Sequence, residues 1–129
     1  YFGHGSAGYV WCGTQWLTPR HLLMLRGVVK ETGHIWFRTC SSFQGKAGHD
    51  FALRVTRYAG CAAAGHTRII GVVQGGLRVL HVGQLPYWPV EEGEPKTTWW
   101  PNVLKWGPNS VLCFAMELPE SHAKNKTTS

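Results

Sequence analysis

Residues 19–27, PRHLLMLRG, are followed after a short polar segment by residues 33–37, GHIWF. In each stretch a histidine, first His21 and then His34, opens a run of apolar residues. Two apolar runs joined by a short polar segment that contains glycine are typical of a β-hairpin. We therefore expect the two runs to pair as strands and to bring both histidines into one neighbourhood of the fold.

The rest of the chain predicts further strands and one late helix. Residues 50–58 alternate apolar and polar side chains, as a strand with one solvated face does, and Gln74-Gly75-Gly76 separates two runs with a clear hairpin pattern. Asn109 or Ser110 can cap a helix over residues 111–118, although so short an apolar segment also fits a strand. The expected strands cover residues 8–11, 21–29, 34–40, 50–58, 68–73 and 77–82. This order indicates an α+β fold, an antiparallel β-sheet packed against a small number of helices.

Length and charge limit the organisation and the partners of the chain. Its 129 residues are enough for one domain with a buried core, which we place at residues 1–119. Residues 120–129 are polar and are expected to form a disordered tail. We expect residues 59–65 to be flexible and residues 86–101 to be irregular and rich in aromatic side chains. The net charge of +6 is compatible with nucleic acid, anionic lipid or an acidic partner, and no run is long enough for a transmembrane segment.

The four cysteines, Cys12, Cys40, Cys61 and Cys113, are widely spaced and form no CxxC pair. This spacing argues against a zinc site, and a chain that is neither short nor rich in cysteine favours reduced thiols in a cytosolic protein. We expect no metal and no cofactor. Cys113 is the candidate nucleophile, because unpaired amides and the helix dipole at the start of the expected late helix would favour a thiolate.

Cys113, His21 and His34 are the residue types of a thiol enzyme. One imidazole can take the proton of the attacking thiol, and a second can hold the first imidazole in its productive tautomer. This chemistry requires that the fold bring the C-terminal segment to the two histidines.

Residues 20–27, RHLLMLRG, resemble the H-box of the lecithin:retinol acyltransferase-like and phospholipase A/acyltransferase proteins, in which a histidine opens an apolar strand that closes on glycine. His34 falls where this family has its second histidine, to within a residue. Cys113, followed by FAMEL at residues 114–118, falls at a similar distance to the family's nucleophilic cysteine, which also starts a helix. The same pair of motifs, the H-box and the NC (cysteine) box, occurs in the 2A proteins of some picornaviruses, such as parechoviruses and kobuviruses. A start at Tyr1 rather than at methionine fits a product cut from a viral polyprotein.

The resemblance implies a circularly permuted NlpC/P60-like (papain-like) arrangement with Cys113 on the late helix. It implies a viral non-structural 2A protein that acts in genome replication in the host cell cytoplasm, including at replication membranes, through host or viral proteins or RNA, with an acyltransferase-like site that can be inactive. The alternative is an active phospholipase/acyltransferase, in which Cys113 attacks an ester carbonyl of a phospholipid, His21 acts as base and then as acid, and His34 orients His21. Leu112 stands where the family has asparagine, and Leu22-Leu23 where it has an aromatic residue and alanine. These departures bear on catalysis more than on fold.

A third interpretation uses other residues. Residues 49–53, HDFAL, resemble the aspartate strand of chymotrypsin-like cysteine proteases, a class that would use His21, Asp50 and Cys61. Only ten residues separate Asp50 from Cys61, which is too few for the strands that lie between acid and nucleophile in a double barrel.

Aromatic and basic residues near the C-terminus suggest one more kind of partner. Trp99 and Trp100, with Lys96 and Lys105, could stack on single-stranded RNA, although no RNA-binding signature accompanies them.

Overall fold

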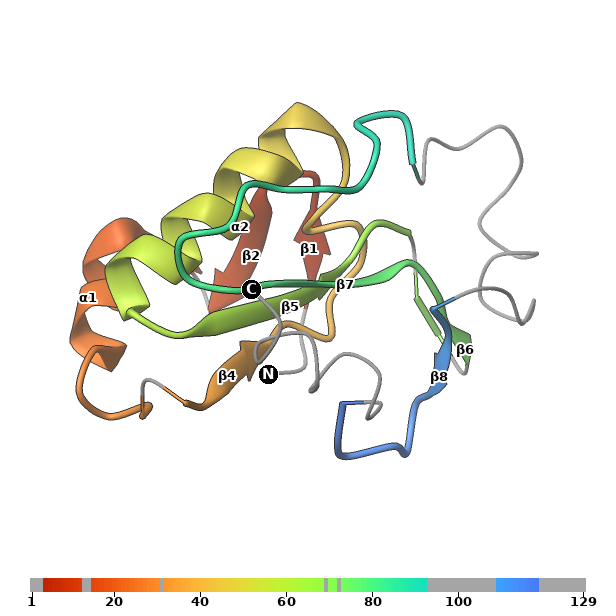
Figure 1. Ribbon diagram of the computed structural model, residues 1–129. Coiled ribbons are helices and arrows are strands. Elements are labelled where there is room, and N and C mark those ends of the chain that lie inside the picture. The colour runs from red at the N-terminus through yellow and green to blue at the C-terminus, as the bar shows by residue number, and fades with distance from the viewer. Residues whose placement is uncertain are drawn as a thin grey trace.

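The computed structural model describes residues 4–12, 15–30, 32–68, 70–71, 73–92 and 109–118 (Figure 1). The helices of these residues are α1 (Pro19–Leu25) and α2 (Gly45–Ala59). The strands are β1 (Gly5–Ser6), β2 (Tyr9–Cys12), β3 (Gln15–Trp16), β4 (His34–Trp36), β5 (Ala62–His66), β6 (Val73–Gln74), β7 (Leu77–Leu80) and β8 (Val111–Leu112).

The central sheet has the strand order β4-β5-β7. β4 runs parallel to β5, with His34 opposite Ala62, and β7 runs antiparallel to β5, with Leu80 opposite Ala63. Parallel neighbours need a long crossover, and α2 supplies it between β4 and β5. The other described strands form two antiparallel sheets, β1-β2-β3 and β6-β8. The predicted α+β class is confirmed, but the central sheet is mixed rather than antiparallel.

The segment predicted as a strand over residues 50–58 is the body of the longer helix, α2. α2 buries a set of residues at helical spacing, which are Gly48, Phe51, Ala52, Val55, Thr56 and Ala59. Gly60 ends the helix in the left-handed conformation, with φ of 71°. The strand prediction was wrong because the alternation of this segment is short, whereas the buried residues follow the 3.6-residue repeat over the whole helix.

The H-box-like segment is also helical, so the strand predicted over residues 21–29 is wrong. Thr18 caps α1, and Pro19 occupies the first helical position, where a missing N–H costs nothing. His21, the third residue, completes a capping box with Thr18. Of the predicted hairpin with residues 34–40, only the short strand β4 forms.

Small residues occupy the centre of the sheet. Residues 59–65 were predicted to be flexible, but most of them belong to the fully buried strand β5. The predicted hairpin of residues 68–73 with 77–82 is also wrong, because β7 pairs with β5 and β6 pairs with β8. The side chains of β5 must be small because other parts of the chain pack closely against the strand. A Cβ added at Gly65 would lie 2.5 Å from the ring of Phe43.

Residues 111–118 form a strand and a turn, so the late helix that was expected to carry Cys113 is wrong. β8 pairs with β6, and the N–H of Ala115 closes the following turn on the carbonyl oxygen of Leu112. Asn109, one of the expected caps, has a left-handed φ of 57°, whereas a capping residue has an extended backbone.

The aromatic-rich segment predicted over residues 86–101 is described as far as residue 92, and that part contains no helix or strand. Trp88 is buried there, and its Nε1 donates to the carbonyl oxygen of Phe43 across 2.9 Å. The predicted tail, residues 120–129, lies outside the described residues, and the single domain over residues 1–119 stays a prediction.

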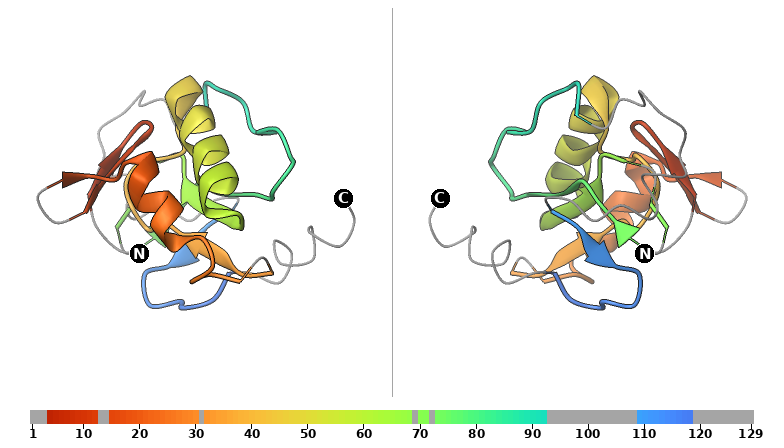
Figure 2. Two further views of the ribbon diagram at one scale, coloured as in Figure 1. Left: turned by 90° about the vertical axis from the view of Figure 1, so that its left-hand side faces the viewer. Right: turned by 90° about the vertical axis from the view of Figure 1, so that its right-hand side faces the viewer.

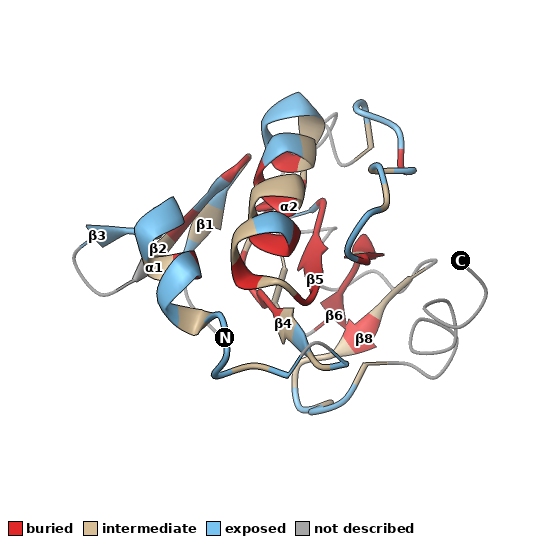
Figure 3. Ribbon diagram, turned by 60° about the vertical axis from the view of Figure 1, so that its left-hand side comes forward, coloured by how far each residue is buried: buried red, intermediate tan, exposed pale blue. Residues whose placement is uncertain are grey.

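The central sheet separates two buried clusters. Side chains alternate between the two faces of a strand, and successive residues of β4, β5 and β7 accordingly belong to different clusters. The cluster on the helix side contains Val10, Leu22, Phe37, Phe43, Phe51, Ala52, Val55, Ala63, Leu80 and Trp88. The cluster on the β8 side contains Trp36, Ala64, Leu77, Val79 and Val111. Figure 2 shows α1 and α2 on one side of the central strands and β8 on the other, and Figure 3 shows the buried residues concentrated on β5 and on one side of α2.

Candidate functional site

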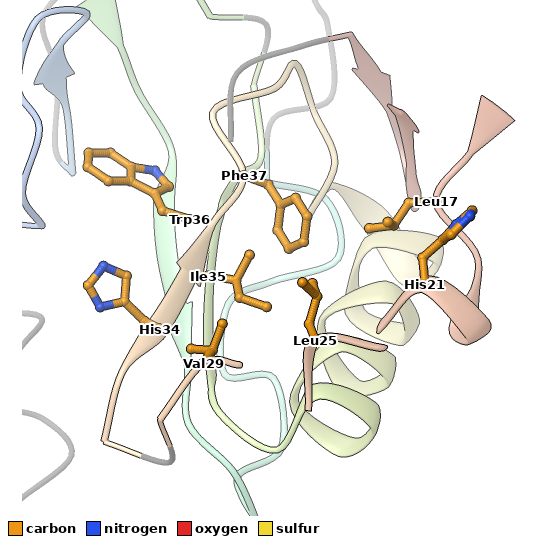
Figure 4. A pocket seen from close by; sticks show the side chains of 8 residues that line it. All are labelled: Leu17, His21, Leu25, Val29, His34, Ile35, Trp36 and Phe37. Atoms are coloured by element: carbon orange, nitrogen blue, oxygen red, sulfur yellow. The ribbon is translucent and has the colours of Figure 1, made fainter. Parts of the chain in front are cut away.

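An apolar groove lies between α1 and β4 (Figure 4). Its volume is about 500 Å³, which is within the range of ligand-binding pockets. Both histidines singled out in the sequence contribute to its lining. The lining residues are Leu17, His21, Leu25, Val29, His34, Ile35, Trp36 and Phe37.

Helical spacing builds one wall of the groove. Leu17, His21 and Leu25 are four residues apart, which places them on one side of α1 and of the turn that leads into it. Leu22, one position on from His21, is buried in the helix-side cluster and fixes α1 on the core. Figure 4 shows Ile35 of β4 pointing toward this wall, with Val29 at one end of the space between them.

His21 is engaged in capping α1. Its Nδ1 accepts the backbone N–H of Thr18 across 3.0 Å, and its own N–H donates to Oγ1 of Thr18 across 3.4 Å. The neutral ring therefore carries its proton on Nε2, and Nδ1 is occupied while the cap is intact. In Figure 4 the imidazole is turned away from His34.

His34 is the exposed first residue of β4. Side-chain alternation places it on the same face of the strand as Trp36, whereas Ile35 and Phe37 face α1. The structure thus brings His21 and His34 to one groove, with their rings pointing in different directions. The geometry in which one imidazole orients the other is not formed.

Cys113 lies in the turn after β8, partly exposed and with a free thiol. Arg38 anchors this turn: its Nη2 donates to the carbonyl oxygen of Leu112 across 2.8 Å, and its Nη1 donates to that of Ala115. Arg38 is also close enough to Cys113 for their charges to interact. Cys113 is not one of the residues that line the groove, and Val111, two positions before it, belongs to the buried cluster on the β8 side of the sheet.

Burial is the main influence on the Arg38 guanidinium. It lowers the pKa of Arg38, and the charge of Cys113 partly opposes this effect. Nε of Arg38 donates to Oε1 of Gln74 across 2.7 Å, and the guanidinium lies over the ring of Trp36, 4.1 Å from its centroid. These contacts make Arg38 a structural anchor of the β8 side of the sheet.

His66 belongs to the same buried polar network, which the sequence did not reveal. Its Nε2 accepts the indole N–H of Trp36 across 3.1 Å, so its Nδ1 carries the proton and donates to the carbonyl oxygen of Gly75 across 2.8 Å. Burial lowers the pKa of His66 from 6.5 to about 4; the bond to Gly75 opposes this shift and the charge of Arg38 adds to it. His66 follows three alanines and a glycine, a context without any catalytic signal.

The residues of the protease alternative are dispersed. Asp50 is exposed on α2 rather than on a strand, and Cys61 is buried in front of β5. Burial raises the pKa of the Cys61 thiol, which favours its neutral form. The aspartate strand expected for a chymotrypsin-like fold is therefore wrong.

Within the described ranges, no three His, Cys, Asp or Glu side chains gather as metal ligands would. No helix in the same ranges is long and apolar enough to span a bilayer. The residues expected to stack on RNA, which are Lys96, Trp99, Trp100 and Lys105, lie outside the described residues.

Comparison of the chain with protein-family models, with curated proteins and with solved structures gives no match.

Proposed function

We propose that this chain is a picornavirus 2A protein of the H-box/NC type that works by binding a host or viral protein and not by catalysis. It acts in genome replication in the host cell cytoplasm, including at replication membranes. The apolar groove between α1 and β4 is its binding surface.

The separation of Cys113 from His21 carries this proposal. A thiol nucleophile needs a base within about 2.6–3.2 Å. Cys113 follows β8, which packs on one face of the central sheet, and His21 sits on α1, which packs on the other face. The sheet itself stands between the candidate nucleophile and the candidate base.

The first turn of α2 supports the same conclusion. The resemblance expects the nucleophile at the start of a helix that packs on the sheet, and α2 is such a helix. Its first residues, Gly45 to Gly48, include no cysteine. The turn at Gly8 lies against this position, since a Cβ there would come within 2.7 Å of the carbonyl oxygen of Ala47. A substrate would therefore find no thiol at this helix end.

Mass spectrometry of the intact protein tests the proposal. The full chain is incubated with phosphatidylcholine vesicles, and the acyl-thioester and released fatty acid are measured for the wild type, Cys113→Ala and His21→Gln. We expect no acyl adduct on the wild type and no fatty acid release above that of Cys113→Ala. An adduct that depends on Cys113 and on His21 would instead establish the thiol phospholipase/acyltransferase.

A further inference from the structure

A second and more polar depression continues the apolar groove. Its volume is about 530 Å³, and its lining includes Arg26, Lys30, Thr32 and Gly60. Val29 lines both hollows, so the two meet at the turn that follows α1. The result is one continuous surface with an apolar part and a basic end.

The positive charge at the basic end is held in place. Nη1 of Arg26 donates to the carbonyl oxygen of Arg57 across 3.2 Å, at the last turn of α2. A Cβ at Gly60 would lie 3.6 Å from the guanidinium, so the side chain packs along the end of this helix. The partial negative charge of a helix C-terminus favours such a cation. The described lining of both hollows contains no carboxylate; Glu31, next to Lys30 in the sequence, lies outside the described residues.

Exposed apolar side chains extend the surface formed by the two hollows. Met24 is 70% exposed and Val28 75% exposed. They belong to α1 and the turn after it, the elements that form the groove wall. Apolar side chains gathered around a groove mark an interaction site, and methionine adapts readily to the shape of a partner.

We infer that this surface binds an acidic amphipathic helix of a partner protein. The inference rests on the proposed function and names the chemistry of the partner. Apolar residues at positions i, i+3 or i+4 and i+7 of such a helix would enter the groove between Leu25 and Ile35. A carboxylate on its flank would meet Arg26 and Lys30.

A protein partner fits these observations better than an anionic membrane. Recognition of anionic lipid headgroups uses clusters of about 4–8 basic residues. The described residues of α1 and its following turn contribute Arg20, Arg26 and Lys30, and Arg26 is held against α2. A charge fixed at one end of an apolar groove selects the orientation of a bound peptide, because affinity then depends on where the peptide carries its carboxylate.

A model peptide tests the inference with the full chain. The probe is a fluorescein-labelled peptide of about 18 residues, because shorter isolated helices are marginal in water. It has leucine at i, i+3, i+4 and i+7 and glutamate on the flanks, and a matched peptide has lysine in place of glutamate. Fluorescence anisotropy measures the binding of both peptides, and thermal unfolding verifies that each variant is folded.

Three variants test whether the acidic peptide binds at this surface. We expect Lys30→Glu and Val29→Asp each to weaken the acidic peptide about tenfold or more. Leu85→Glu is the matched control, because Leu85 is 79% exposed and lies in the loop after β7. It is expected to leave binding unchanged. The lysine peptide is expected to bind at least about tenfold more weakly than the acidic one.

The outcomes separate this inference from the proposed function. If the lysine peptide binds equally well and Val29→Asp abolishes its binding, the groove is a docking site but the acidic partner is wrong. If neither peptide responds to Lys30→Glu or Val29→Asp, the inference is overturned. If phosphatidylserine vesicles, but neither peptide, bind in a way that depends on Lys30, the partner is a membrane and the inference is again overturned. An acyl-thioester on Cys113 contradicts the non-catalytic function itself, whereas none of these peptide or vesicle outcomes does.

Discussion

The indole Nε1–H of Trp36 donates to Nε2 of His66 across 3.1 Å, and this bond links the edge strand β4 to the buried strand β5. A proton on Nε2 would place two N–H groups against each other beside the cation of Arg38. The network can therefore form only with neutral His66, which agrees with the burial that lowers the pKa of His66 to about 4.

Acid is expected to destabilise the protein through His66. Because the pKa is about 4 in the folded chain and 6.5 as the ordinary value, the unfolded chain takes up a proton first as pH falls. The contribution of neutral His66 to the free energy of unfolding is fully present above pH 6.5, and it is lost progressively as pH falls toward 4. The loss due to this residue is about 3 kcal/mol, at 1.36 kcal/mol per pKa unit.

Chemical denaturation at several pH values between 7 and 4 measures this loss. His66→Gln is the matched control, since a carboxamide can accept from Trp36 and donate to Gly75 without titrating. The wild type is expected to lose about 3 kcal/mol more than His66→Gln over this range. Parallel pH profiles for the two proteins would contradict the assignment.

Phe43 packs against two glycines, through its ring in one case and through its backbone in the other. A Cβ at Gly65 would meet the ring of Phe43, whereas a Cβ at Gly48 would overlap the backbone carbonyl carbon of Phe43. Gly65→Ala is expected to cost about 1–3 kcal/mol by overpacking, and Gly48→Ala more, because backbone cannot move aside as a side chain can.

The double variants separate the two glycine contacts. Phe43→Leu should recover part of the stability lost in Gly65→Ala and none of that lost in Gly48→Ala. Urea unfolding of the four-member cycle for each glycine gives the coupling free energy. Equal coupling in both cycles would show that the contacts are not as described.

Arg78 and Glu92 tie the loop after β7 to the sheet. Nε of Arg78 donates to Oε2 of Glu92 across 2.9 Å, Nη2 donates to Oε1, and Thr67 donates to Oε2 across 3.0 Å. Burial alone would raise the pKa of Glu92, but the hydrogen bonds and the charge of Arg78 outweigh it and hold the pKa below its usual value.

Glu92→Gln should therefore cost about 1–3 kcal/mol and speed amide exchange in the loop of residues 82–92. Thr67→Val removes only the weaker, neutral donor and should have a smaller effect. If Glu92→Gln leaves both unfolding and exchange unchanged, the pair does not hold the loop. The Glu92 contribution is present above the ordinary pKa of 4.5 and is lost as pH falls below it.

His21 is expected to act on stability and not on chemistry. His21→Ala removes a capping-box member and should cost about 0.5–2 kcal/mol. His21→Gln should restore most of this loss, because glutamine at the third helical position can reach back to the N–H of Thr18. Circular dichroism during urea unfolding measures both variants. Equal losses for alanine and glutamine would argue against a capping role.

The sequence allowed the α+β class to be predicted, together with both histidines at one surface. It also carried the start of α1, since Thr18-Pro19 is a typical helix opening. The apolar run over residues 22–25 concealed this signal because a short buried helix and a strand have the same composition. The same ambiguity affected residues 50–58, where only the longer pattern of buried positions distinguishes the helix.

The remaining errors concern pairing between distant segments. Nothing local indicates that β7 pairs with β5 or that β6 pairs with β8, because these choices depend on which faces are covered in the folded chain. Cys113 was placed beside the histidines on the strength of a late helix that does not form. Arg38 anchors the turn that contains Cys113 across a sequence separation of more than seventy residues. No local sequence pattern predicts such a contact.

A protein that works without catalysis requires Cys113 and His21 to be chemically independent. Peptide-resolved mass spectrometry can follow iodoacetamide labelling of Cys113 at pH 7 in the wild type and in His21→Gln, which keeps the cap on α1. Equal labelling rates in the two proteins are predicted. A fall of about tenfold or more in His21→Gln would show that the imidazole activates the thiol, as expected of a nucleophile and its base, and would overturn the non-catalytic function.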